Sequence, residues 1–206
     1  MNELRYHWFD LGLGLAALVA VFLLLISPNL ISYLLWINLI ALFLHQVEEY
    51  RWPGYFPGMM NSVMFASENP DRYPLNANIA LIVNVTVGWL FFTAAAVFGA
   101  RAVWLGIAVM LVSAGNFIAH SLVFNLKGRT IYNPGMITAV VLFLPIVVFF
   151  FYLVIDQRAA SPVDWVIGLV LGATLNYLGI LKLIDWLKDE GTPYVFPRRF
   201  LPPALR

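Results

Sequence analysis

The chain has 206 residues, of which 62% are hydrophobic and 11% charged, with a formal net charge of +1. A water-soluble domain of this length has too small an interior for so many apolar side chains, so the composition indicates an integral membrane protein. The near-neutral charge gives no basis for nucleic-acid binding. The absence of cysteine excludes disulfides, thiolate metal sites and thiol catalysis.

Six apolar stretches are each long enough to cross a bilayer, which takes about 20 residues. They cover residues 10–27, 31–50, 76–99, 102–124, 133–155 and 163–186. The sequence therefore predicts an all-α, polytopic membrane protein with a single transmembrane domain over residues 1–206. The first stretch has no net-basic leader and no small-residue cleavage pattern after it, so we expect a retained helix and not a signal peptide.

Basic residues indicate the orientation of this bundle. With six crossings both termini lie on one side of the membrane. All of the 12 Lys and Arg residues except Arg101 and Arg158 fall on that side. The positive-inside rule predicts that the two termini, including the tail at 188–206, are cytoplasmic.

The second stretch ends in the turn His45-Gln46-Val47-Glu48-Glu49. An ionisable side chain within a membrane helix is costly and usually functional. Glu49 and Glu48 follow His45 by four and three residues, so on a helix they lie about 40° and about 60° from it. Imidazole and carboxylate together bind zinc or iron(II), which predicts His45 and Glu49 as metal ligands. The alternative is a polar helix end that reaches the headgroups.

The fourth stretch carries Asn116 and His120 near its cytoplasmic end. Four residues apart, they share one face of a helix. We predict His120 as a third metal ligand and Asn116 as a catalytic residue. The alternative for both is hydrogen bonding that joins membrane helices.

The fifth stretch begins on the same side with Tyr132-Asn133-Pro134-Gly135. One interpretation is a simple helix start, with Asn133 as the cap and Pro134 at the first helical position. The other makes Tyr132 and Asn133 catalytic residues, beside a helix start whose free N–H groups face an anionic group of the substrate. Because all three motifs lie at similar depth, we expect one shared site.

These three motifs, in this order and on separate stretches, resemble the HXXEE family of bacterial integral membrane proteins. The resemblance covers about residues 35–190. It implies an enzyme-like set of polar residues in a helical membrane domain, located in the bacterial inner membrane. It implies no particular reaction.

The connector over residues 52–74 is too long for a simple turn. Met59, Met60, Val63 and Met64 recur on one face of a helix, which predicts a short amphipathic helix lying in the membrane interface. It follows the His45–Glu49 turn directly. It is therefore interpreted either as a lid over the site or as an anchor of the loop.

The function favoured by these residues is a metal-dependent enzyme that acts on a lipidic substrate from the cytoplasmic leaflet. His45, Glu49 and His120 would bind a divalent metal, zinc in preference to iron, and an open position would remain. Glu48 would then activate water or hold a ligand histidine. Hydrolysis of an ester, amide or phosphoester bond fits this set best.

Two other classes remain open. A metal-free acid/base enzyme, such as an isoprenoid cyclase or isomerase, would use a protonated Glu48 or Glu49. A non-enzymatic protein would be a transporter, for which no repeat is visible, or a haem protein with His45 and His120 as axial ligands. Bound metal distinguishes these classes.

Overall fold

The computed structural model describes residues 2–206, and these residues form helices and no β-strand. The all-α prediction is therefore confirmed for this part of the chain. The helical elements, in chain order, are α1 (Asn2–Leu25), α2 (Leu30–Tyr50), α3 (Phe56–Met59), η1 (Met60–Met64), α4 (Ala77–Val83), η2 (Asn84–Leu90), α5 (Phe91–Phe98), η3 (Gly99–Ala102), α6 (Val103–Ile118), η4 (Ala119–Val123), α7 (Phe124–Gly128), α8 (Met136–Thr138), η5 (Ala139–Phe143), α9 (Leu144–Asp156), α10 (Pro162–Thr174), η6 (Leu175–Lys182), α11 (Leu183–Leu187), η7 (Arg198–Phe200) and η8 (Pro203–Leu205).

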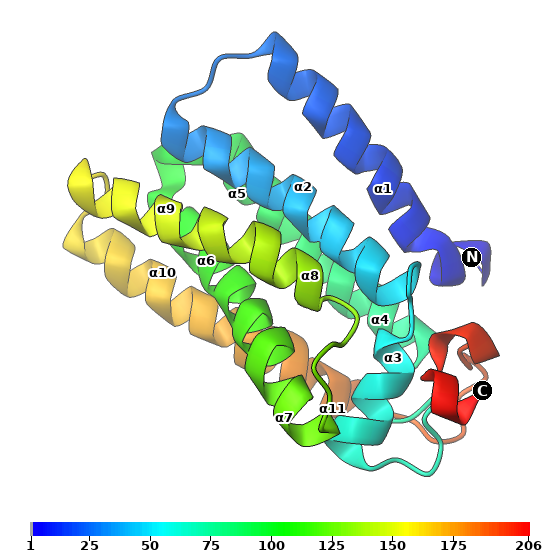
Figure 1. Cartoon of the computed structure of the whole chain (residues 1–206). Coiled ribbons are helices and arrows are strands. Elements are labelled where there is room, and N and C mark those ends of the chain that lie inside the picture. The colour runs from blue at the N-terminus through cyan, green and yellow to red at the C-terminus, as the bar shows by residue number, and fades with distance from the viewer. Residues whose placement is uncertain (1) are drawn as a thin grey trace.

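Five helical segments of the described chain are long and apolar enough to cross a membrane. They are Glu3–Leu25, Leu30–Tyr50, Ala77–Gly128, Met136–Asp156 and Pro162–Leu187. The third has 52 residues. It folds back at Gly99, whose φ of 54° is unfavourable for any residue with a side chain. As a result, the segment forms two limbs, α4–α5 and α6–α7, and α5 lies beside α6 next to the fold-back (Figure 1).

Helix α2 is the central helix of the bundle (Figure 1). In its apolar window 56% of the residues are buried, against 22–33% in the other four segments. It packs against α1, α5, α6 and α9, so most of its circumference faces protein. A polar turn near the end of this helix is therefore enclosed by neighbouring helices instead of facing lipid.

Three of these five segments contain π-helical stretches: η2 and η4 lie in Ala77–Gly128, η5 in Met136–Asp156 and η6 in Pro162–Leu187. Such stretches are rare and occur frequently at functional sites, because the wider turn shifts the side chains that follow. Here η4 carries His120 and η5 begins directly after Thr138. Both residues belong to the site described below.

The connector and the tail pack together under the bundle, at the end where both termini lie (Figure 1). The connector forms the short helix α3–η1, whose Met59 and Met60 are buried as expected for its apolar face. Asn61 is also buried, and its side chain hydrogen-bonds the backbone of Pro70 and Leu75. The tail buries Phe200 against this helix.

Candidate metal centre

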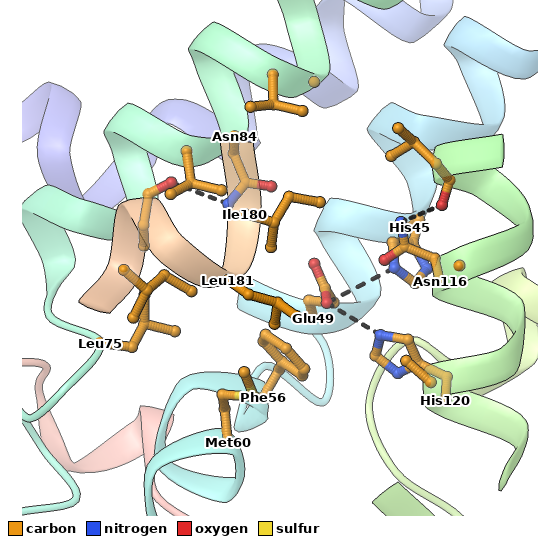
Figure 2. Close-up of a pocket in the computed structure, with 18 of the residues that line it drawn as sticks. His45, Glu49, Phe56, Met60, Leu75, Asn84, Asn116, His120, Ile180 and Leu181 are labelled. Atoms are coloured by element: carbon orange, nitrogen blue, oxygen red, sulfur yellow. Dashed lines mark hydrogen bonds and ion pairs between the residues drawn. The ribbon is translucent and has the colours of Figure 1, made fainter. Parts of the chain in front are cut away.

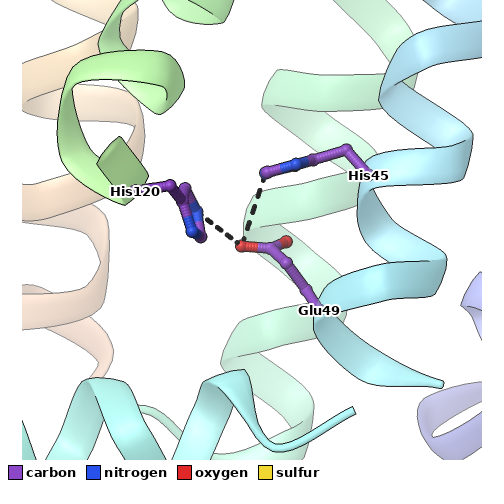
Figure 3. A group of neighbouring side chains, drawn as sticks. All are labelled: His45, Glu49 and His120. Atoms are coloured by element: carbon purple, nitrogen blue, oxygen red, sulfur yellow. Dashed lines mark ion pairs between the residues drawn. The ribbon is translucent and has the colours of Figure 1, made fainter. Parts of the chain in front are cut away.

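His45, Glu49 and His120 meet between α2 and η4, and each is at most 5% exposed (Figure 3). Oε1 of Glu49 lies 3.6 Å from Nε2 of His45 and 3.3 Å from Nε2 of His120. The two imidazole rings are nearly perpendicular, at 88°, with centroids 4.8 Å apart. The structure thus brings the three predicted ligand residues together, with one nitrogen of each ring directed at the same carboxylate.

The protonation of the His120 ring follows from its neighbour Asn133. Nδ2 of Asn133 donates to the carbonyl of His120 at 2.7 Å and to Oδ1 of Asn125 at 2.8 Å. Because both of these oxygens are acceptors, they identify the nitrogen end of the Asn133 amide. Oδ1 of Asn133 therefore faces Nδ1 of His120, at 2.6 Å. An amide oxygen only accepts, so Nδ1 carries a proton, and in the neutral form of the ring Nε2 presents a lone pair to Glu49.

The same reasoning applies to His45 through Thr138 and Glu48. The hydroxyl of Thr138 donates to Oε2 of Glu48 at 2.6 Å, so its oxygen accepts from Nδ1 of His45 at 2.9 Å. Nε2 of His45 is then the unprotonated nitrogen. It is fully buried and makes no hydrogen bond with any described residue.

With both imidazoles neutral, the centre consists of three acceptors that face one another. Buried acceptors repel and lose hydration unless a cation lies between them. In a tetrahedral zinc site with bonds of about 2.0–2.1 Å, neighbouring ligand atoms lie about 3.3–3.4 Å apart. The ligand atoms here lie within 4.8 Å of one another, and two of their separations are 3.3 and 3.6 Å. The donor set and its spacing fit a divalent metal with three protein ligands.

Glu48 points away from this centre, toward the start of α8. Oε1 accepts from the backbone N–H of Ile137 at 3.1 Å and from the hydroxyl of Tyr132 at 3.1 Å. Oε2 accepts from the backbone N–H and the hydroxyl of Thr138, at 2.8 and 2.6 Å. The expectation that this helix start faces a substrate anion is therefore wrong: the protein's own carboxylate occupies its N–H groups.

The Tyr132–Gly135 turn lies against both imidazoles. Gly135 adopts a φ of 102°, and a Cβ there would lie 2.4 Å from Cε1 of His120 and 2.8 Å from Cε1 of His45. Only glycine fits this contact. Gly135, not Asn133, precedes the first helical residue, so the interpretation of Asn133 as a helix cap is wrong; its side chain binds His120 instead.

Tyr132 connects this turn to α2 through Glu48. Burial, together with the Glu48 carboxylate, raises the pKa of the Tyr132 hydroxyl. The hydroxyl therefore remains protonated and donates to the carboxylate. The geometry places Tyr132 beside Glu48 and not among the three converging acceptors.

Asn116 lies beside His45 and lines a cavity of about 230 Å³ that opens next to the centre (Figure 2). Its Nδ2 donates to the carbonyl of Val112 at 3.0 Å. The amide group is therefore anchored to its own helix. The cavity also contacts His45, Glu49 and His120, so a molecule bound in it would reach the candidate ligands.

Thr138 and Phe56 are site residues that the sequence analysis missed. The sequence holds no local signal for Thr138, because the carboxylate that its hydroxyl binds, Glu48, belongs to another helix. The ring of Phe56 lies 5.3 Å from that of His120 and lines the cavity. Because Phe56 belongs to the connector, only the tertiary structure could reveal this contact.

The fold and the site define a helical protein with membrane-type segments and a buried His/Glu/His group that can hold a metal ion. A family model described as "protein of unknown function with HXXEE motif" matches residues 36–150. The chain belongs to this HXXEE family. No curated protein and no solved structure matches it.

Proposed function

We propose that the protein is a metal-dependent membrane enzyme whose metal is held by His45, Glu49 and His120. The observation that carries this proposal is the convergence of Nε2 of His45, Nε2 of His120 and Oε1 of Glu49, with Nε2 of His45 buried and unpartnered. Zinc is the favoured metal, and iron(II) is the alternative for two histidines and one carboxylate. With three protein ligands a position stays open, as in catalytic zinc sites.

The chain's own residues orient the two imidazoles. Oδ1 of Asn133 accepts from Nδ1–H of His120. The hydroxyl of Thr138 accepts from Nδ1–H of His45 and itself donates to Glu48. Such partners fix the tautomer and the ring direction of ligand histidines. Because both oxygens of Glu48 are engaged, we favour this holding role over water activation. A bound metal would supply Lewis-acid polarisation of a carbonyl or phosphoryl oxygen, which favours hydrolysis of an ester, amide or phosphoester bond.

We propose further that the chain crosses the membrane six times, with the site at the cytoplasmic side. The fold-back at Gly99 divides the 52-residue segment into two limbs, each long enough for a crossing. Arg101, at this fold-back, and Arg158, in the turn before α10, are the basic residues predicted to lie on the opposite side. A lipidic substrate would then reach the site from the cytoplasmic leaflet of the inner membrane.

The haem alternative is disfavoured by the ring geometry. With centroids 4.8 Å apart and Glu49 between the two Nε2 atoms, the space holds no macrocycle. The acid/base alternative requires a proton in place of the metal among the same acceptors. Metal analysis separates these two cases.

The test is elemental analysis of protein purified without chelators. We expect bound metal in the natural chain and in His7→Ala, an exposed histidine away from the site. We expect loss of metal in His45→Ala and His120→Ala. Metal retained in both of these variants would overturn the proposal, and a metal-free natural chain would favour the acid/base enzyme.

A further inference from the structure

The cavity beside the metal centre has mostly apolar walls contributed by α2, α3–η1, α4–η2, α6–α7 and η6–α11. Phe56 and Met60 close its lower end in Figure 2, while Ile180 and Leu181 lie opposite His120. Among the described lining residues, Leu181 alone is largely exposed, at 52%. The cavity therefore reaches the protein surface beside Leu181.

The cavity exists because the last membrane-type helix leaves α6 partway along its length. Its first part is pressed onto α6 at Gly168, where a Cβ would lie 2.7 Å from the carbonyl of Trp104. Farther along, Asn176 of η6 still binds the carbonyl of Leu111 on α6, and beyond it the helix meets η2 and α4, with Gly179 close to Val87. The wedge between η6 and η4 forms the cavity.

The surface around this opening is apolar. Ile118 and Leu122, on α6–η4, are 50% and 54% exposed. Leu181, on η6, is 52% exposed. In a helix of membrane-spanning length, exposed apolar side chains at this position face hydrocarbon. The exposed ion pair of Lys182 and Asp185 lies within one turn of Leu181. If the chain crosses the bilayer as proposed above, the opening beside Leu181 faces hydrocarbon close to this polar helix end.

We propose that the cavity binds one hydrocarbon chain of a bilayer lipid, which passes laterally between η4 and η6 beside Leu181 and brings its polar group to the metal centre. The inference rests on the proposed function for the role of that polar group. Burial of apolar chain surface against these walls supplies the binding free energy, at about 25 cal/mol per Å². The lipid chain would therefore be the part of the substrate recognised by shape.

The test is photolabelling in vesicles of phosphatidylethanolamine and phosphatidylglycerol, where one acyl chain of the phosphatidylglycerol carries a diazirine. We expect label on cavity residues such as Met60, Val87 and Ile184 in the natural chain. Leu181→Trp fills the opening and should abolish this label. Leu178→Trp, an equally bulky change one turn away and outside the cavity lining, should retain it.

Leu181→Ala should also retain the cavity label, which separates blocking from misfolding. Label confined to outward-facing residues such as Leu169 and Val170, or equal cavity label in Leu181→Trp and Leu178→Trp, would overturn the inference. Metal is measured in the same preparations. Cavity label without metal would overturn the metal proposal alone, and metal without cavity label would overturn the lipid-chain site alone.

Discussion

Two buried polar groups lie on neighbouring faces of the last turns of α2. They differ in whether hydrogen-bond donors face the acceptors within each group. The amide network joins Gln46, Asn84, Trp89 and Tyr50. Nε1 of Trp89 donates to Gln46, Nε2 of Gln46 donates to Asn84, and Nδ2 of Asn84 donates to Tyr50, at 2.9, 3.0 and 3.2 Å. The acceptor cluster, His45, Glu49 and His120, contains no such donor.

This difference distinguishes a structural polar group from a ligand site. A network in which each donor meets an acceptor stabilises helix packing and needs nothing further. A cluster of buried acceptors is stabilised only when a cation or a proton lies between them. Both groups are polar and lie at the same level of α2, so burial of polar residues alone does not identify the site.

The largest expected effect comes from Glu49→Gln. The amide replaces a charged ligand by a neutral one and supplies a donor to the imidazoles, so the variant should lose its bound metal. Gln46→Leu, three residues earlier in the amide network, should keep it. Elemental analysis measures the metal content of both variants. Equal loss of metal in Glu49→Gln and Gln46→Leu would contradict the proposed difference between the acceptor cluster and the amide network.

Glu48→Gln should weaken metal binding by about 10–100-fold, the usual effect of removing a partner that orients a ligand histidine. The new amide nitrogen would face N–H donors of α8. The hydrogen bonds that position Thr138, and through it the His45 ring, would weaken. Competition with a chelating dye measures the affinity. Glu68→Gln, at an exposed acid, is the control. Unchanged affinity with lost turnover would assign Glu48 to water activation instead.

Gly135→Ala should destabilise the protein by more than about 1 kcal/mol, because alanine is strained at a φ of 102° and its Cβ meets both imidazoles. Thermal unfolding in detergent, followed by circular dichroism, measures the loss. Gly14→Ala provides the control, since a Cβ at Gly14 has open space. An unfolding temperature equal to that of the control would show that the turn tolerates a side chain.

The smallest effect is expected from Trp89→Phe, which removes one hydrogen bond of the amide network. Hydrogen bonds between membrane helices contribute on average about 0.6 kcal/mol, so the stability should fall by about that amount. The metal content should stay unchanged. A loss of metal in this variant would mean that the two groups are coupled.

Helical periodicity was sufficient to predict much of the candidate site. Spacings of four residues put His45 with Glu49, and the depth of each motif along its helix put His120 at the same level. Periodicity did not predict that Glu48 faces α8, because a carboxylate beside the site on an ideal helix can turn to either neighbour. The role of Asn133 was likewise hidden, since a local helix start explains its sequence equally well.

Composition and periodicity by themselves determined the all-α class, the apolar segments and the pairing of His45 with Glu49, because these depend on hydropathy and on contacts within a helical turn. The depth of His120 along its own apolar stretch indicated only that it lies at the same level. Only the tertiary structure decided the hydrogen bonds of Glu48, Thr138 and Asn133, the contact of Gly135 with both imidazoles, and the cavity beside Leu181. These features depend on how separate helices approach one another. That approach is set by packing between residues far apart in the chain, which no local pattern records.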